Sequence, residues 1–130
     1  MTITETLNQA SAGLLMPSES EFPFEGFHWD NVNSLSAEVL LELTGHAPDT
    51  QVEETDLDYL FRNLAVSKEW HDEIQQANVP KFQQLKQIVE DNLSEITVYR
   101  VGTIELDVYI VGKPKAKNGL AGLATKVIET

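Results

Sequence analysis

The last third of the chain carries three segments with the composition and alternation of β-strands, and these constrain the fold most. Residues 96–101 and 103–111 are rich in Val, Ile, Tyr and Thr and meet at Gly102, as the two strands of a hairpin do. Residues 120–130 alternate between two faces in the same way. Three such strands, close together in the sequence, predict a mainly antiparallel sheet.

Helical patterns precede these strands. The predicted helices are residues 2–11, a segment from Ser34 or Ser36 to residue 43, residues 55–64 and residues 80–93. In the second helix, the predicted inner face holds Val39, Leu40 and Leu43. Thr55 with Asp58 resembles a capping box at the start of the third helix, and Pro80 suits the first turn of the fourth. Helices followed by antiparallel strands predict the α+β class.

Length and composition predict one domain covering residues 1–130. A chain of 130 residues with 42% hydrophobic residues can bury a core without covalent staples. It has no cysteine, which excludes disulfides and thiolate metal sites. The first residues lack a basic start followed by an apolar run, and no segment has the apolar length of a membrane span. We therefore expect a cytoplasmic protein without membrane contact.

The charge is unevenly distributed along the chain. The formal net charge is −12, and residues 1–112 hold 20 of the 21 acidic but only 5 of the 9 basic residues. Direct binding to nucleic acid is not expected, because phosphates require the opposite charge. A basic protein is a plausible partner, because an acidic surface accelerates association with a positively charged cleft. The alternative is that the acidic residues only confer solubility.

Two exposed segments are candidates for partner contacts. SESE at residues 18–21 predicts an acidic loop, and Trp70 stands among charged and polar residues at positions 68–73. A tryptophan in such a setting is typical of an interface anchor. The alternatives are a solvated turn at residues 18–21 and a Trp70 side chain that folds back onto its own protein.

The end of the sequence is a third candidate. If residues 120–130 form a strand, the α-carboxylate and hydroxyl of Thr130 follow directly after it. These groups offer only oxygen ligands, which suit a hard cation such as Mg²⁺. The alternative is that the strand simply ends there.

Motifs of catalysis are missing from the sequence. There is no Walker motif, GxGxxG, GxSxG or zinc signature, so an enzyme is not predicted. Asp56 and Asp58 suit the first turn of a helix better than a metal site. The residues by themselves therefore indicate an acidic α+β binding module.

Six segments, which occur in order along nearly the whole chain, resemble the nuclease A inhibitor family. They are ASAGLL with SESEFPFE within residues 10–25, LTGH at 43–46, KEW at 68–70, VPKFQQL at 79–85, VYRVGTIELDVYIVG at 98–112 and NGLAGLATKVIET at 118–130. Members of this family are small acidic cyanobacterial proteins that inhibit a sugar-nonspecific, metal-dependent nuclease.

The resemblance implies a fold and an interface. The fold is a three-layer α/β/α sandwich of the pathogenesis-related protein 1 type. Thr130 is implied to bridge the catalytic Mg²⁺ of the bound nuclease, Glu19 to contact its active site, and Trp70 to pack in the interface. The metal belongs to the nuclease, so the free inhibitor requires no cofactor. The resemblance also implies that the protein is a monomer and forms a 1:1 complex with the basic cleft of the nuclease.

Two features depart from the family pattern. Lys68 stands where the family has a glutamine that makes a polar contact, and a lysine facing a basic cleft would be repelled. The loop at residues 112–119 is longer and more basic than is typical. The alternative function is therefore an acidic interaction module with the same fold and a different basic or metal-containing protein as its target.

Overall fold

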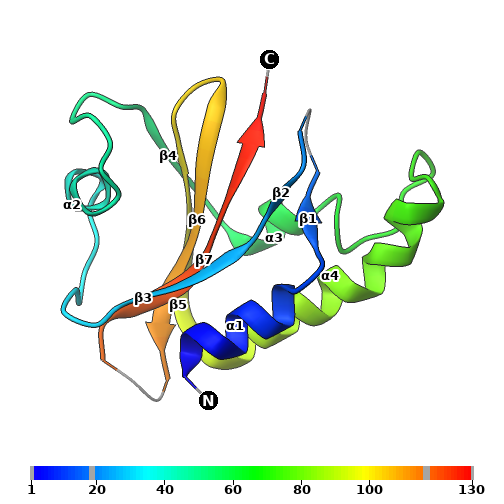
Figure 1. Cartoon of the computed structure of the whole chain (residues 1–130), viewed down its shortest axis with the longest axis horizontal. Coiled ribbons are helices and arrows are strands. Elements are labelled where there is room, and N and C mark those ends of the chain that lie inside the picture. Colours follow the sequence, from blue (N-terminus) through cyan, green and yellow to red (C-terminus); the bar gives the residue numbers. More distant parts are fainter. Residues whose placement is uncertain (1, 18–19, 116–117, 130) are drawn as a thin grey trace.

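The computed structural model describes residues 2–17, 20–115 and 118–129 (Figure 1). The helices within these residues are α1 (Ile3–Ser11), α2 (Ala37–Leu43), α3 (Leu57–Phe61) and α4 (Glu73–Asn92). The strands are β1 (Leu15–Met16), β2 (Phe22–Pro23), β3 (Glu25–Trp29), β4 (Val52–Thr55), β5 (Leu93–Val101), β6 (Glu105–Pro114) and β7 (Leu120–Ile128). None of the helices in these ranges has the length and apolar content needed to cross a membrane.

Five strands form one antiparallel sheet in the order β3-β7-β6-β5-β4, and β1 pairs with β2 separately. The predicted hairpin at Gly102 is confirmed, since β5 and β6 lie on either side of this residue and pair with each other. The φ angle of Gly102 is 116°, a conformation that favours glycine. β6 continues to Pro114, so the predicted loop at residues 112–119 begins later than expected. The α+β class with an antiparallel sheet is confirmed; the more specific sandwich type stays a prediction.

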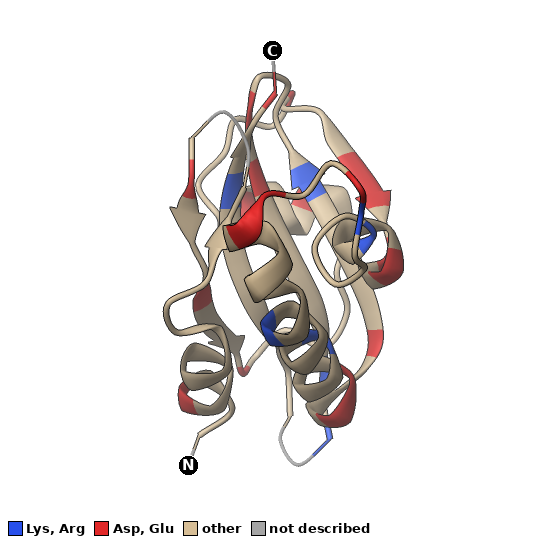
Figure 2. Ribbon diagram, turned by 90° about the vertical axis from the view of Figure 1, so that its right-hand side faces the viewer, with Lys and Arg blue, Asp and Glu red and all other residues tan. Residues whose placement is uncertain are grey.

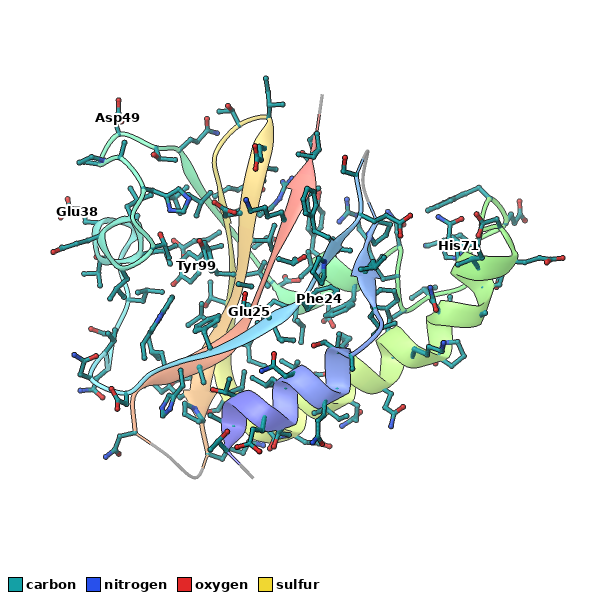
Figure 3. All side chains as sticks on the ribbon, viewed as in Figure 1. Phe24, Glu25, Glu38, Asp49, His71 and Tyr99 are labelled. Atoms are coloured by element: carbon teal, nitrogen blue, oxygen red, sulfur yellow. The ribbon has the colours of Figure 1, made fainter. Side chains whose placement is uncertain are left out.

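The larger core lies between the sheet and three helices. The buried residues include Leu7 of α1, Phe61 of α3 and Leu85 of α4, which pack with Val108 and Leu123 of the sheet. Figure 3 shows Phe24 on this side of the sheet, and its ring meets Phe82 edge-on at 6.3 Å. The helical spacing of these apolar residues is what places α1, α3 and α4 against one face.

The opposite face of the sheet is covered by α2. Leu40 and Leu41 pack against Tyr99, whose side chain points toward α2 in Figure 3. The prediction that Val39 and Leu43 face inward is wrong, because their side chains are 37% and 41% exposed. A helix of only seven residues contacts the sheet over a short length, and the adjacent residues Leu40 and Leu41 make this contact.

The start of α4 differs from the prediction. The helix begins at Glu73, and Pro80 lies inside it. Asp72 and Gln75 form a capping box, in which each side chain accepts a hydrogen bond from the other residue's backbone N–H, at 2.8 and 2.9 Å. This cap satisfies the first free N–H groups and lets the helix start well before the proline. The result is a helix of 20 residues whose first turns project beyond the sheet (Figure 1).

The predicted cap of the third helix is off by one residue. Thr55 is the last residue of β4 and pairs with Val98 of β5. Asp56 caps α3 instead, since its Oδ1 accepts a 2.7 Å hydrogen bond from the backbone N–H of Tyr59. Both residues are favourable caps, and the strand pairing of Thr55 decides between them.

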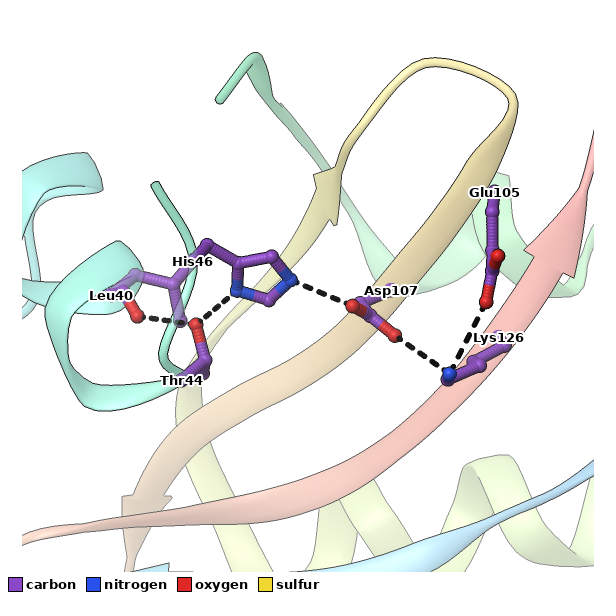
Figure 4. A network of polar contacts seen from close by, with 6 residues as sticks. All are labelled: Leu40, Thr44, His46, Glu105, Asp107 and Lys126. Atoms are coloured by element: carbon purple, nitrogen blue, oxygen red, sulfur yellow. Dashed lines mark hydrogen bonds and ion pairs between the residues drawn. The ribbon is translucent and has the colours of Figure 1, made fainter. Parts of the chain in front are cut away.

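A chain of polar contacts ties the end of α2 to the sheet (Figure 4). The Thr44 hydroxyl lies 2.7 Å from the Leu40 carbonyl oxygen and 2.6 Å from His46 Nδ1. His46 Nε2 lies 2.7 Å from Asp107 Oδ2 on β6. The chain continues to Lys126 of β7, whose Nζ is 3.3 Å from a carboxylate oxygen of Glu105. Both ring nitrogens of His46 are thus engaged, and the imidazole links α2 to the sheet.

We expect His46→Ala to lower the free energy of unfolding by about 1–2 kcal/mol, because it removes two half-buried hydrogen bonds. Urea denaturation monitored by circular dichroism measures the change. His28→Ala is the control, since the structure gives His28 one hydrogen bond, 2.9 Å from its Nε2 to the Asn118 carbonyl oxygen. Equal losses in the two variants would contradict a bridging role for His46.

Two tyrosines near α2 should make the folded protein less stable at alkaline pH. Burial raises the pKa of Tyr99 and of Tyr109, and the nearby carboxylates Glu54 and Asp107 respectively add to these shifts. Because the pKa is higher in the folded than in the unfolded chain, the unfolded chain ionises first, and stability falls as the pH rises above about 10. Urea denaturation between about pH 9 and 11 should show a shallower decline for the double variant Tyr99→Phe/Tyr109→Phe. An unchanged slope would contradict the assignment.

Candidate functional site

Three segments that are far apart in the sequence meet at one end of the sheet. They are the β1–β2 hairpin, the segment from α3 to the start of α4, and the end of β7 (Figure 1). Together they line a groove of about 700 Å³. Its lining includes Pro17 and Glu21 from the hairpin, Trp70 and Ile74 from the second segment, and Val127 and Glu129 from the third.

The β1–β2 hairpin is attached beside β7. Met16 is buried, and the Thr125 hydroxyl of β7 donates a 3.0 Å hydrogen bond to the carbonyl oxygen of Pro23. These contacts hold β1 and β2 beside β7, and Pro17 and Glu21, which belong to the loop between the two strands, contribute to the groove lining. Glu19, the residue predicted to contact a partner, lies in this loop but outside the described residues.

The end of β7 is held from two sides. Its last residue, Ile128, pairs with Glu105 of β6, and the Glu129 N–H donates a 2.8 Å hydrogen bond to the Ile104 carbonyl oxygen. The Glu129 carboxylate forms an ion pair with Arg100 of β5. The predicted strand therefore exists up to Ile128, and residue 129 is still bound to the sheet. Thr130 lies outside the described residues.

Trp70 is exposed, and the loop that carries it is well supported. Its side chain is 61% exposed, and its ring lies 4.5 Å from that of His71. The Lys68 N–H donates to His71 Nδ1 at 3.3 Å, so Nε2 carries the ring proton that is donated to the Asn63 carbonyl oxygen at 2.9 Å. These bonds tie the loop to the end of α3. Trp70 therefore does not take a core position, although its ring contacts His71 of the same loop.

Ile74 is an apolar residue of the groove that the sequence analysis missed. Its side chain is 72% exposed, although it lies about three helical turns before the buried Leu85 on the same face of α4. It is exposed because the start of the helix extends past the sheet (Figure 1). The capping signal at Asp72 and Gln75 could have placed Ile74 in the first turn and revealed it. With the exposed side chains of Leu15 and Tyr59, it gives the groove an apolar part beside its polar and charged lining residues.

Lys68 does not line this groove. It contributes instead to a neighbouring hollow of about 500 Å³ with Asp58, Val66 and Lys86. There Lys86 pairs with Asp58 at 2.6 Å, which is the main cause that raises the pKa of Lys86. Lys68 and Trp70, two positions apart, therefore contribute to different hollows.

The described groove lining carries three acidic residues, Glu21, Asp72 and Glu129, and two basic ones, Arg62 and Arg100. Figure 2 shows acidic positions at the start of α4 and near the C-terminal end. Of the basic residues in the described lining, Arg62 lies over the Tyr59 ring at 3.7 Å, and Arg100 is paired with two glutamates. Burial opposes the charged form of Arg100, but hydrogen bonds to Glu129 and Glu53 outweigh it and raise its pKa. The groove thus combines apolar side chains with polar ones and a small excess of acidic over basic residues.

The described residues show no group of three or more His, Asp or Glu side chains placed to hold a metal ion. The groove instead offers exposed apolar side chains that a partner can bury, among polar and charged residues. These properties describe an acidic α+β protein with a partly apolar groove built from three segments.

The comparison with known families agrees with this class. The family model described as nuclease A inhibitor-like protein matches residues 1–130, and the chain belongs to this family. The resemblance inferred from the six sequence segments is thereby confirmed. No curated protein matches the chain. Membership suggests a nuclease inhibitor rather than an enzyme, with a nuclease as its partner.

Proposed function

We propose that the protein inhibits a sugar-nonspecific, Mg²⁺-dependent endonuclease by inserting the grooved end of its sheet into the active-site cleft. The observation that supports this most is the meeting of three segments in one groove, because each carries or adjoins a residue implied in the contact. Trp70 lines the groove, Pro17 and Glu21 lie on either side of Glu19 in the chain, and Glu129 precedes Thr130. Family membership supports the nuclease as target.

In this proposal Thr130 supplies oxygen atoms to the catalytic Mg²⁺ of the nuclease. Mg²⁺ prefers oxygen ligands and keeps exchangeable waters, so a carboxylate delivered in a fixed direction can replace one of them. The hydrogen bond and ion pair that hold Glu129 support such a fixed direction. The inhibitor then occupies the place of a scissile phosphate, and the free protein carries no metal of its own.

Trp70 and Ile74 supply the apolar part of the proposed contact. Exposed apolar side chains that become buried at the centre of an interface account for much of its affinity. Lys68 lies beside them in a separate hollow, and we propose that it makes a peripheral contact. Because Lys68 lies at the periphery of the proposed contact, it should be repelled less by the basic cleft than a lysine at the centre would be.

Glu19→Ala should weaken inhibition by about 2 kcal/mol, because it removes a carboxylate that faces the active site of the nuclease. The inhibition constant in a plasmid cleavage assay measures this change. Glu38→Ala is a matched control, since Glu38 is an exposed glutamate on α2, which covers the opposite face of the sheet. If both variants inhibit as well as the intact chain, the acidic loop is not part of the contact.

Several properties of the complex follow from the proposal. The acidic surface accelerates association with a basic cleft, and direct binding to nucleic acid is not required. The protein acts as a cytoplasmic monomer of one domain, in a 1:1 complex, without membrane contact and without catalytic activity of its own. The pathogenesis-related protein 1 sandwich and a cyanobacterial origin belong to the same proposal, as implications of the family resemblance.

The test of function is titration of the untagged protein into a sugar-nonspecific, Mg²⁺-dependent endonuclease that cuts plasmid DNA. Stoichiometric loss of cleavage is the expected result. Full cleavage at excess inhibitor would contradict the proposal and favour the alternative, an acidic module for another basic or metal-containing protein. The presence of Lys68 in place of the family's glutamine favours this alternative. Lys68→Gln is the first variant to assay in that case.

A further inference from the structure

Arg100 joins two parts of the sheet that are not neighbours. It lies on β5, directly across from Glu53 of the edge strand β4, and its Nη1 is 3.0 Å from Glu53 Oε1. Its other terminal nitrogen, Nη2, reaches past β6 to the carboxylate of Glu129, which follows β7. One guanidinium therefore bridges the edge strand and the end of the last strand.

The burial of Arg100 distinguishes it from the other basic residues in this region. Its side chain is 17% exposed, whereas Lys126 is 46% exposed and pairs with Glu105 and Asp107, both on the adjacent strand β6. Removing a charge from water is costly unless it is paired in good geometry. A planar guanidinium with two carboxylate partners meets that condition and also defines their relative positions.

Glu129 is bound through both its backbone and its side chain. The Glu129 N–H is held by the carbonyl oxygen of Ile104, in the turn between β5 and β6, and its carboxylate by Arg100. Without Arg100, only the backbone hydrogen bond remains among the interactions described for this residue. Arg100 and Glu129 both line the groove and also a second hollow with Glu53, Gly102 and Leu106.

We propose that Arg100 is a positioning residue that holds Glu129 and thereby directs the residue after it toward the partner. The Glu129 carboxylate is already engaged by Arg100, so a cation of the partner meets Thr130 rather than Glu129. The inference rests on the proposed function for the role of Thr130. The anchoring of Glu129 by Arg100 is a property of the free protein and can be tested without a nuclease.

The first test measures the mobility of the chain end in the free protein. Arg100→Met keeps most of the apolar stem but removes the charge, and Glu53→Gln removes the other ion-pair partner while leaving Glu129 in place. The ¹⁵N heteronuclear NOE of the Glu129 and Thr130 amides should fall in Arg100→Met and stay unchanged in Glu53→Gln. An unchanged NOE in Arg100→Met, or an equal decrease in both variants, would overturn the anchoring role. Amide chemical shifts of the core residues verify that each variant is folded.

The second test is a double-mutant cycle with removal of Thr130, read as nuclease inhibition. Arg100→Met should weaken inhibition roughly tenfold in the intact chain and by no more than about twofold in the chain without Thr130, because residues that act through one another are not additive. Equal weakening in both backgrounds would overturn positioning through Thr130. An intact chain that does not inhibit would overturn the proposed function instead, and the NOE measurement would still decide the role of Arg100.

Discussion

Removal of Thr130 is expected to weaken nuclease inhibition by about 4 kcal/mol, roughly a thousandfold. In the proposed complex, this residue supplies the ligands to Mg²⁺, and the new terminal α-carboxylate of a chain that ends at Glu129 lies one residue short of the metal. The Glu129 side chain is already paired with Arg100, and its N–H is bound to Ile104. The inhibition constant for plasmid cleavage, measured with untagged protein, gives the effect.

A C-terminal tag is the matched experiment for Thr130. A tag keeps the residue but converts its α-carboxylate into a peptide carbonyl and adds bulk, so it should also abolish most of the inhibition. Unfolding by urea should be nearly unchanged in both variants, since the core residues closest to this end, such as Val127, are retained. Full potency in the truncated chain would refute the metal bridge while leaving the groove as an interface.

Trp70→Ala is expected to have the second largest effect, a weakening of at least about 2 kcal/mol, or roughly 30-fold. The 61% exposed indole lies at the groove on a loop held by the hydrogen bonds of His71, so it offers a large apolar surface with little freedom to lose. The dissociation constant from calorimetric titration with a catalytically inactive nuclease measures the effect. Ile74→Ala should weaken binding less, because its side chain is smaller.

The control for Trp70 is Leu43→Ala. Leu43 is another exposed apolar residue, 41% exposed, but it lies on α2 and therefore covers the other face of the sheet. Its removal should leave binding unchanged. If Trp70→Ala binds as well as the intact protein, the groove is not the contact surface.

The fold could be predicted where a local pattern and its packing agree. The strands of the hairpin at Gly102 and the last strand follow from alternation, because side chains on a strand must point to opposite faces. Leu57, Leu60 and Phe61 of α3 are buried as their helical spacing indicates. Two predicted helix starts failed where two local signals compete: Pro80 with the Asp72 capping box, and Thr55 with Asp56. The inward prediction for Val39 and Leu43 failed because the short helix α2 buries only Leu40 and Leu41.

The candidate site could be predicted only in part. Trp70 was identified from its polar neighbours, and its exposure is confirmed. Ile74 was missed, because an apolar residue at helical spacing is normally buried and only the overhang of α4 exposes it. Glu19 and Thr130 were identified from the acidic loop, the end of the last strand and the family resemblance, and their roles stay predictions. The separation of Lys68 from Trp70 into different hollows could not be read from positions two residues apart.

The sequence by itself determined the acidic character, the α+β class and the membership of the nuclease A inhibitor-like family, since charge, periodicity and motif order are properties of the chain alone. Only the tertiary structure decided which segments share a surface. The groove joins residues near positions 17–21, 70–74 and 127–129, and Arg100 reaches Glu129 across an intervening strand. Such contacts depend on strand order and on how far a helix extends past the sheet, and neither is encoded in local sequence spacing.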